Sequence, residues 1–393
     1  MKEVNIIGTG FSGLTLAYYL NKAKPDLIIN IFEQKDKCSG LVSSVYEKNT
    51  IFELGASSLY LTKTLEQLCY DLDLKFIAPK NRNNKYILVN NSIKTPVQIL
   101  KPMDWLFLPR TLYLLKNLPP DTKVNALEWS KHYFGVNIAE NIISPIIQGI
   151  FSCSAGDLSS TALINYIKTL RNLPKPATRS RLINFKKGLN ELLATIYNHL
   201  KQKDNIRFNF NQKGKLEKDK VNYVCTSLKS AQEILKDQTL QWLKDLNQCQ
   251  TLPLHTYNIL SDNTLKINGF GVLFPQKEKG ILGVINKSYM FPQHVNDIKT
   301  HLETWITSKN IETKELLSFR SKHLNSLTDA SIIKKAHKEW PHALPLYNEA
   351  LINFQKNYHS IENKQIKLHG NYVNSIGLAS ILEQSKFLGE THQ

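Results

Sequence analysis

The sequence predicts an α/β fold in which segments from both ends of the chain contribute to one domain. The first observation comes from the N-terminus. Residues 4–7 have the pattern of a short buried strand, residues 12–23 that of a helix, and residues 27–32 that of a second buried strand. The glycine turn GTGFSG, at residues 8–13, joins the first strand to the helix, and the second strand ends at Glu33. This order of elements is typical of a nucleotide-binding βαβ unit.

Each glycine of the turn has a physical role. Gly8 allows the tight turn, Gly10 lets the backbone approach a pyrophosphate, and Gly13 lets helix and strand pack closely. The helix N-terminus, at Phe11 and Ser12, offers free N–H groups and the positive end of a dipole to phosphates. The pattern predicts a dinucleotide site, the alternative being a chance glycine turn.

The acid favours certain dinucleotides over others. Glu33 lies twenty residues past Gly13, where a carboxylate can accept hydrogen bonds from ribose hydroxyls. An acid there disfavours a 2′-phosphate, so the sequence predicts FAD or NAD rather than NADP.

The second observation is a glycine-bearing loop at residues 370–377 that runs into a C-terminal helix. An NAD dehydrogenase usually keeps its Rossmann unit contiguous, whereas a two-domain flavoprotein weaves the chain between its domains. Nucleotide-type loops at both ends favour the second pattern. We therefore expect a two-domain FAD-dependent oxidoreductase with an interwoven Rossmann-type FAD domain, whose last helix points its N-terminus at the flavin ring.

The expected division of the chain follows from these loops and from changes of composition between them. The FAD-binding domain comprises residues 1–75, 181–250 and 346–393; the mixed α+β substrate domain comprises a hairpin at 76–96 and residues 251–345; and residues 97–180 form a helical, membrane-facing subdomain.

Bulk composition limits the functional classes. The chain has 393 residues, 42% hydrophobic and 21% charged, with no run of eighteen apolar residues. Because the nucleotide strand begins at once, no signal peptide is expected, and we predict a cytoplasmic protein. Neither the five cysteines nor the eleven histidines have metal-ligand spacing, so no metal is predicted.

The net charge of +17 has two interpretations. It is either a solvated, lysine-rich surface or a surface that meets anionic lipid or an acidic ligand. Nucleic-acid binding is not expected, since no reading motif accompanies the charge.

One stretch is unusually apolar and aromatic. Residues 97–120 interleave large apolar side chains such as Trp105 with Lys101, Arg110 and Lys116. The stretch is too interrupted to span a bilayer, but it could lie in the interface and give peripheral contact with the cytoplasmic membrane face. The alternative is an ordinary helical subdomain with a substrate tunnel.

Short motifs in a fixed order resemble those of the protoporphyrinogen oxidases, a family of the FAD-dependent amine oxidase superfamily. The most specific is GFGVLFP at residues 269–275. The others lie at residues 52–55 (FELG), 84–89, 145–159, 185–189, 221–227, 281–283, 291–292, 340–347 and 368–378. The resemblance runs through the whole chain.

The resemblance implies a site and a reaction. Its cofactor residues are Gly8, Gly10, Phe11, Ser12, Gly13, Glu33, Gln34, Ser39, Gly40, Gly55, Ala56, Ser57, Gly370, Ile376, Gly377 and Leu378. Lys85 takes the place of a family arginine that faces a porphyrin propionate, and Phe270 and Leu273 could line an apolar slot. The implied reaction oxidises a tetrapyrrole, protoporphyrinogen IX or coproporphyrinogen III, with molecular oxygen as acceptor, in haem biosynthesis.

Two other functions stay open. Ser39, Ser43 and Ser375 replace usual family residues, which motivates a non-catalytic relative that binds a tetrapyrrole or a protein partner. A superfamily oxidase acting on an amine or a carotenoid is the other. The sequence predicts no catalytic acid–base pair, and His369 is interpreted as a structural residue. For the assembly, a homodimer is one option.

Overall fold

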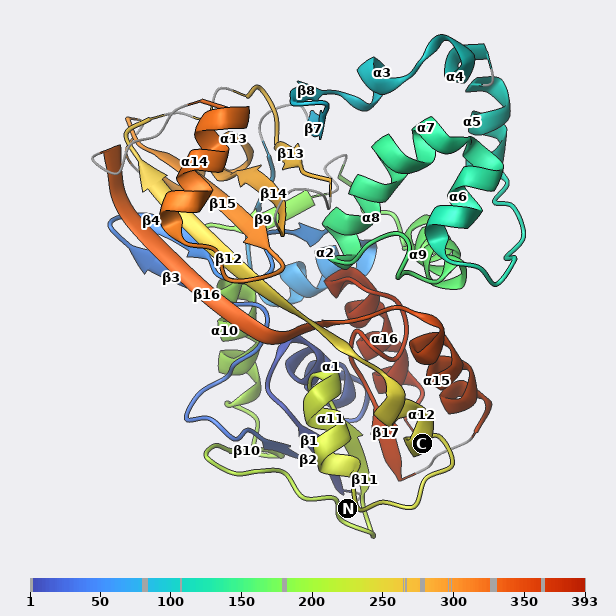
Figure 1. The fold of residues 1–393 in the computed structure, drawn as a ribbon. Coiled ribbons are helices and arrows are strands. Elements are labelled where there is room, and N and C mark those ends of the chain that lie inside the picture. Colours follow the sequence, from blue (N-terminus) through green and yellow to red (C-terminus); the bar gives the residue numbers. More distant parts are fainter. Residues whose placement is uncertain are drawn as a thin grey trace.

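The chain is described by a computed structural model, which covers residues 3–79, 84–106, 108–178, 182–263, 265, 267–275, 280–295, 297, 299–325, 331–361 and 365–392. Two large sheets, two small sheets and a group of helices are the main parts of the described chain, and the two termini lie close together at one end (Figure 1).

The first sheet contains strands from both ends of the chain. Its order is β10 (Ile206–Asn209), β2 (Ile28–Phe32), β1 (Glu3–Ile7), β11 (Val221–Val224) and β17 (Ile366–Leu368). Every pairing in it is parallel. The predicted α/β fold with an interwoven Rossmann-type sheet is therefore confirmed, although β10 was not predicted.

Two helices distant in sequence pack together beside this sheet. They are α1 (Phe11–Ala23) and α16 (Leu378–Glu390). They cross closely, because a Cβ added at Gly389 would lie 2.7 Å from backbone and side-chain atoms of Tyr19. The sequence predicts these helices over residues 12–23 and roughly 376–388, so the observed bounds differ from the predicted ones by one or two residues.

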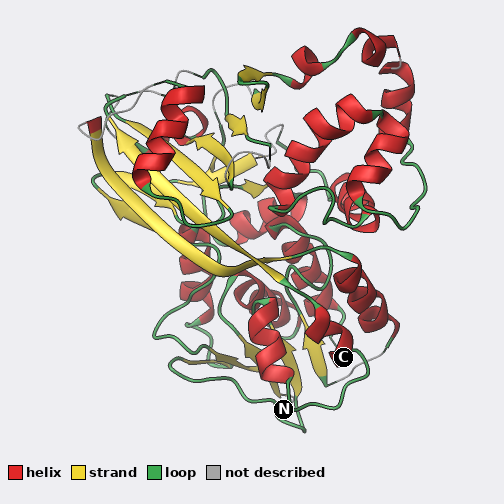
Figure 2. Ribbon diagram, in the orientation of Figure 1, coloured by secondary structure: helices red, strands yellow, loops and turns green. Residues whose placement is uncertain are grey.

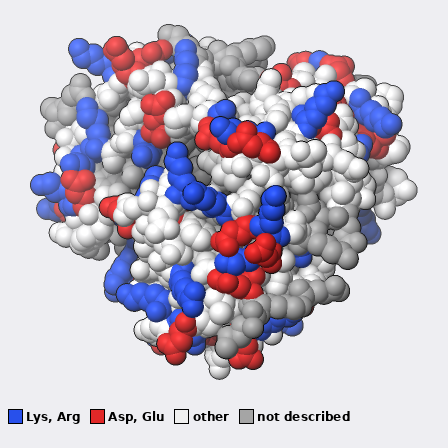
Figure 3. Space-filling model, turned by 90° about the horizontal axis from the view of Figure 1, so that it is seen from below, with Lys and Arg blue, Asp and Glu red and all other residues white. Residues whose placement is uncertain are grey.

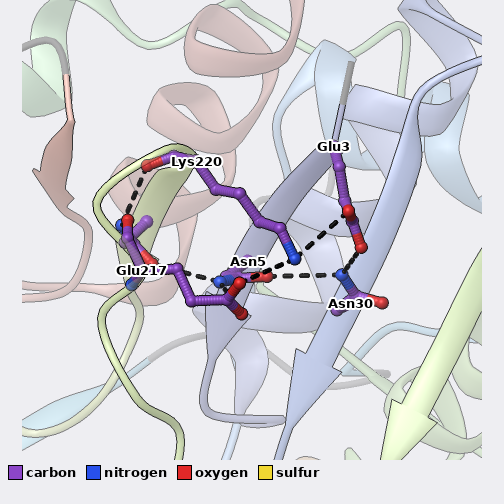
Figure 4. Close-up of polar contacts among 6 residues, drawn as sticks. Glu3, Asn5, Asn30, Glu217 and Lys220 are labelled. Atoms are coloured by element: carbon purple, nitrogen blue, oxygen red, sulfur yellow. Dashed lines mark hydrogen bonds and ion pairs between the residues drawn. The ribbon is translucent and has the colours of Figure 1, made fainter. Parts of the chain in front are cut away.

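A polar row crosses the middle of the same sheet. Asn30, Asn5 and Asn222 lie in register on β2, β1 and β11 and are buried. The Asn30 amide donates to Asn5 at 3.3 Å, and the Asn5 amide donates to Asn222 at 3.2 Å. Lys220 pairs with Glu3 at 3.1 Å and with Glu217 at 2.8 Å (Figure 4). This network ties residues 217–220, which precede β11, to the parallel sheet.

The second sheet is mostly antiparallel and has the order β16, β12, β15, β14, β13, β7, β8. Their bounds are Ile332–Pro345, Thr251–Ser261, His301–Thr307, Ile281–Asn286, Gly271–Leu273, Lys85–Val89 and Ser92–Lys94. The predicted hairpin between β7 and β8 is confirmed, with positive φ angles at Asn90 (51°) and Asn91 (58°), as a type I′ turn requires. Strands β12, β15 and β16 were not predicted from the sequence.

A group of short helices projects beside the second sheet (Figure 2). It comprises α3 (Pro96–Ile99), α4 (Pro102–Leu106), α5 (Leu108–Lys116), α6 (Ala126–Phe134), α7 (Val136–Ile138), a π-helical turn (Ala139–Ile143), α8 (Ser144–Phe151) and α9 (Ser160–Asn172). None of the helices in the described part of the chain has the length and apolarity to cross a membrane.

The remaining elements connect these parts. They are β3 (Ser44–Glu47), β4 (Thr50–Glu53), β5 (Leu59–Tyr60), α2 (Lys63–Asp71), β6 (Phe76–Ile77), β9 (Leu182–Phe185), α10 (Asn190–Leu200), α11 (Leu228–Leu235), α12 (Leu243–Gln248), α13 (Lys287–Met290), a 3-10 turn (Pro292–His294), α14 (Thr313–His323) and α15 (Glu349–Ser360).

Candidate cofactor and substrate site

The glycine turn between β1 and α1 has the geometry that its spacing predicts. Gly8 has a φ angle of +107°, and a Cβ added at Gly13 would lie 1.9 Å from the Gly8 carbonyl oxygen. Helix α1 therefore starts directly over the end of β1. Gly10 is its N-cap and has no side chain to block the exposed N–H groups.

A second loop faces this turn. A Cβ added at Gly10 would lie 3.4 Å from the Ser39 carbonyl oxygen, and one added at Gly40 would lie 3.1 Å from the Gly10 Cα. The two backbones thus approach each other with only hydrogen atoms between them. A side chain at either glycine would therefore press against the facing backbone and disturb the contact between the turn and residues 39–40.

Glu33 is held against the same turn. The Thr9 hydroxyl donates to Oε2 at 2.7 Å, and the Lys35 N–H donates to Oε1 at 3.1 Å. The Ser39 hydroxyl is 3.5 Å from Oε1. The carboxylate is buried at 7% exposure and points to the C-terminal edge of the parallel sheet, next to Gln34. Ribose hydroxyls are bound at this position in Rossmann folds.

The segment after β4 continues from the second loop toward the second sheet. The Ala56 N–H donates to the Leu41 carbonyl at 3.1 Å, and a Cβ added at Gly55 would lie 1.9 Å from that oxygen. Trp340 of β16 donates its indole N–H to the Leu54 carbonyl at 2.7 Å. Residues 54–57 therefore lie between the two sheets.

The C-terminal loop reaches the same edge from the other side. His369 follows β17 and donates its backbone N–H to Val224 at 3.0 Å. Gly377, with φ +112°, caps α16, and Ile376 and Leu378 pack against the neighbouring cores. Glu383 of α16 accepts hydrogen bonds from the Thr62 and Thr64 hydroxyls, both at 2.7 Å. These bonds fix α16 beside the chain that follows Ser57.

His369 has a structural environment. Its Nε2 lies 2.8 Å from the Ser385 hydroxyl, which in turn lies 2.7 Å from the Thr15 hydroxyl of α1. Complete burial lowers the pKa of His369 to about 3. The ring is therefore neutral and ties β17, α16 and α1 together, as expected for a structural histidine.

The residues present fit a dinucleotide cofactor. Several buried polar atoms around these loops have no hydrogen-bond partner in the described part of the chain. They are Ser57 Oγ, Ser375 Oγ, Tyr372 OH and His369 Nδ1. Such atoms are uncommon in folded proteins and indicate a missing partner. A ligand rich in oxygen and nitrogen atoms, bound between the glycine turn and the C-terminal loop, would supply one.

The expected substrate residues lie on the second sheet. Lys85 is exposed at the start of β7, and β7 pairs with β13. Leu273 of β13 packs on α8, since a Cβ added at Gly149 would lie 2.6 Å from its side chain. Phe270, just before β13, is buried with Phe291. Gln148 of α8 donates to the Phe274 carbonyl at 2.7 Å and joins the helices to this sheet.

Two buried charges beside Ser57 were missed. The Lys287 ammonium donates to the Ser57 carbonyl at 3.0 Å, and burial lowers its pKa to about 8. Glu53 is fully buried and accepts from the Asn184 amide at 2.9 Å. Glu53 could have been found from the sequence, because it is the acidic residue of the FELG motif at residues 52–55. For Lys287 there was no such signal, because a lysine after a strand is usually a surface residue.

Proteins of similar sequence include enzymes named as porphyrinogen oxidases. A family model described as NAD(P)-binding Rossmann-like domain matches residues 6–71. Coproporphyrinogen III oxidase of Staphylococcus aureus is 24% identical over 278 residues, which are 60% of this chain and 58% of that enzyme. Chloroplastic protoporphyrinogen oxidase of Nicotiana tabacum is 21% identical over 96% of this chain and 83% of its own length.

The fold comparison covers nearly the whole molecule. A crystal structure assigned to the protoporphyrinogen oxidases, from Exiguobacterium sp. 255-15, superimposes with a TM-score of 0.78 at 16% identity, over 99% of this chain and 98% of that one. The resemblance inferred from the motifs is therefore confirmed as a relationship of sequence and fold.

Proposed function

We propose that this distant relative of the porphyrinogen oxidases is an FAD-dependent oxidase that converts a porphyrinogen to the porphyrin in haem biosynthesis, with molecular oxygen as acceptor. The observation that carries the proposal is that the glycine turn at residues 8–13 contacts the loop at residues 39–40 at the edge of the parallel sheet that the loop after β17 also reaches. The segment after β4 contacts the second sheet, since Trp340 of β16 donates to the Leu54 carbonyl, and β13 of that sheet carries part of the GFGVLFP motif.

The chain's own residues would hold the cofactor. The backbone at Gly8, Gly10 and Gly13 would receive the pyrophosphate, and Glu33 the ribose. The loops at residues 39–40, 55–57 and 376–378 would flank the rest of the molecule. When bound, FAD would supply the redox chemistry by accepting hydride equivalents and passing electrons to oxygen, which gives hydrogen peroxide.

The substrate side needs an apolar slot with a cation at its mouth, because a porphyrinogen is a large apolar ring with carboxylate arms. Lys85 is the proposed cation, and Phe270 and Leu273 are the proposed walls. Protoporphyrinogen IX and coproporphyrinogen III differ in their number of carboxylates, and both are proposed as substrates to test.

Peripheral membrane contact is a further part of the proposal. Helices α4 and α5 expose a group of large apolar side chains: Met103, Trp105, Leu106, Leu112 and Tyr113. Phe107, in the middle of the same stretch, is outside the described residues. The face of the molecule seen from below mixes positive and negative side chains and has no field of one sign (Figure 3). The exposed apolar side chains of α4 and α5 are the proposed contact with a cytoplasmic membrane face.

The visible spectrum of the purified protein tests the proposal. We expect oxidised-flavin bands, FAD in the supernatant after denaturation, and oxygen-dependent growth of porphyrin fluorescence when either porphyrinogen is added. A folded protein that stays colourless with added FAD would contradict the proposal and support the non-catalytic alternative. A flavoprotein that oxidises only an amine would support the other alternative.

A further inference from the structure

We propose that Lys287 is a positioning residue for the flavin ring, whose ammonium holds loop 55–58 and also donates to the acceptor edge of the ring. The proposal rests on the FAD assignment made above. It adds that the Lys287 ammonium contacts the ring and raises its midpoint potential.

The ammonium of Lys287 is short of hydrogen-bond acceptors. The side chain is fully buried, at 0% exposure, and packs with Nζ 5.0 Å from the centre of the Phe291 ring. An ammonium has three N–H donors. The Ser57 carbonyl, at 3.0 Å, is the acceptor found for it among the described residues. Burying a charge with so few partners costs free energy unless a ligand or water completes the set.

Neighbouring groups do not neutralise this charge by direct contact. Glu53 is the carboxylate nearest in electrostatic effect. Its Oε1 is engaged by the Asn184 amide and by the Leu189 N–H, at 2.9 and 2.8 Å, and its Oε2 by the Ser44 hydroxyl. His294 is neutral, because burial lowers its pKa to about 4. Within the described ranges, no ion pair involves Lys287.

A second observation at the same loop points to a ligand. The Ser57 hydroxyl is buried and has no partner in the described part of the chain, while the carbonyl of that residue accepts from Lys287. The loop is continuous with the proposed pyrophosphate site through the bond between Ala56 and Leu41. The Lys287 ammonium and the unpartnered Ser57 hydroxyl therefore both lie at this loop. In the proposed binding mode, the part of the cofactor beyond the pyrophosphate would pass here.

The position of α13 links this loop to the substrate side. Lys287 begins α13, and the helix ends next to Phe291, which is buried in one cluster with Met290 and Phe270. The ammonium therefore lies between the cofactor loop and the proposed substrate wall. A flavin ring has carbonyl oxygens and ring nitrogens along one edge, and this edge becomes more negative on reduction. A fixed positive charge there stabilises the reduced ring more than the oxidised ring.

The substitution Lys287→Met tests the charge, since methionine fills a similar volume and replacing a buried charge by an apolar group is often tolerated. We expect the reduced ring to lose about tenfold more affinity than the oxidised ring, which equals a two-electron midpoint potential about 30 mV lower. Lys229→Met, at a lysine whose side chain is 47% exposed on α11, is the matched control and should leave the potential unchanged.

The outcomes separate the possible roles. If Lys287→Met weakens both redox forms equally, or leaves the potential where it was, Lys287 only supports the loop and the proposal is overturned. If Lys287→Met does not fold, Lys287→Gln replaces it. Glutamine keeps a hydrogen-bond donor but removes the charge, so the same shift of the midpoint potential is expected. A wild-type protein that binds no FAD would instead refute the proposed function, before any variant is made.

Discussion

Gly10 and Gly13 are only three residues apart, yet the structure gives them different duties. A Cβ at Gly13 would lie 1.9 Å from the Gly8 carbonyl oxygen, directly after β1, whereas a Cβ at Gly10 would lie 3.4 Å from its nearest atom, the Ser39 carbonyl oxygen. Gly10 also has an ordinary backbone conformation, with φ −68°. Gly10 therefore leaves the N-terminus of α1 uncovered beside residues 39–40, and Gly13 is needed for the packing of α1 on the turn.

Gly10→Val should abolish FAD binding and leave a folded apoprotein, because the branched side chain would enter the space between the turn and residues 39–40. Gly13→Ala should instead lower the free energy of unfolding by about 1–3 kcal/mol, because the new Cβ would clash with the Gly8 carbonyl oxygen. Flavin content and thermal unfolding measure the two effects. Full flavin occupancy in Gly10→Val would refute the nucleotide assignment.

Lys85→Ala should raise KM for a porphyrinogen and leave kcat nearly unchanged. The loss of a charge-assisted contact with a propionate is worth about 1–3 kcal/mol. Steady-state kinetics measure the effect, with Lys94→Ala on the neighbouring strand β8 as a control. Equal KM values for Lys85→Ala and the wild type would remove Lys85 from the site.

Three buried histidines predict loss of stability in acid. Burial lowers the pKa of His294 and His301 to about 4 and that of His369 to about 3. In the unfolded chain these rings take up protons below about pH 6.5. Their contribution is therefore complete above that pH and is lost progressively as the pH falls from about 6.5 toward 4.

Urea unfolding between pH 7.5 and 4.5 measures this loss. Each histidine should contribute up to about a tenfold change of the unfolding constant per pH unit. His301→Gln should reduce the slope. A free energy of unfolding that does not change over this window would contradict the assignment.

At the scale of elements, β15 and α14 are joined by a buried ion pair. The Arg320 Nε donates to both Glu303 carboxylate oxygens, at 3.0 and 3.1 Å, and both side chains are 0% exposed. The Trp305 indole N–H donates to the same carboxylate at 3.0 Å. The pair fixes the helix on the second sheet, which carries the proposed substrate wall.

Arg320→Met should destabilise the protein by about 3–5 kcal/mol, because it leaves the Glu303 carboxylate buried without its cation. The double variant Glu303→Met/Arg320→Met should recover much of this loss, since no unpaired charge is then buried. Denaturant unfolding of both variants decides the matter. A single variant as stable as the wild type would show that the carboxylate finds another partner.

At the scale of the molecule, the helices of residues 97–120 stand away from the cofactor edge and expose their apolar side chains. Leu106→Glu/Leu112→Glu should weaken binding to vesicles that contain anionic lipid by about tenfold or more. Two carboxylates would then replace exposed leucines that we expect to enter the lipid. Vesicle co-sedimentation measures it. The control Tyr70→Glu/Phe387→Glu changes two exposed rings elsewhere, and equal effects of both doubles would rule out a specific membrane face.

The sequence by itself determined the nucleotide-binding unit and the end of the chain that completes it. A glycine turn, a helix and an acid act over short distances, so their spacing records their geometry. The β7–β8 hairpin was predictable for the same reason, through Asn90 and Asn91. Strands β12, β15 and β16 were not, because their pairing joins segments far apart in the chain and their side chains do not alternate cleanly.

Only the tertiary structure decided what surrounds the site. The bond between Lys287 and the Ser57 carbonyl spans 230 positions in the sequence. The lysine is buried because the segment after β4 packs against α13, and the Glu303–Arg320 pair is buried because α14 packs on the second sheet. Local patterns carry no signal for such contacts, since the energy of a buried charge is set by whatever the fold brings next to it.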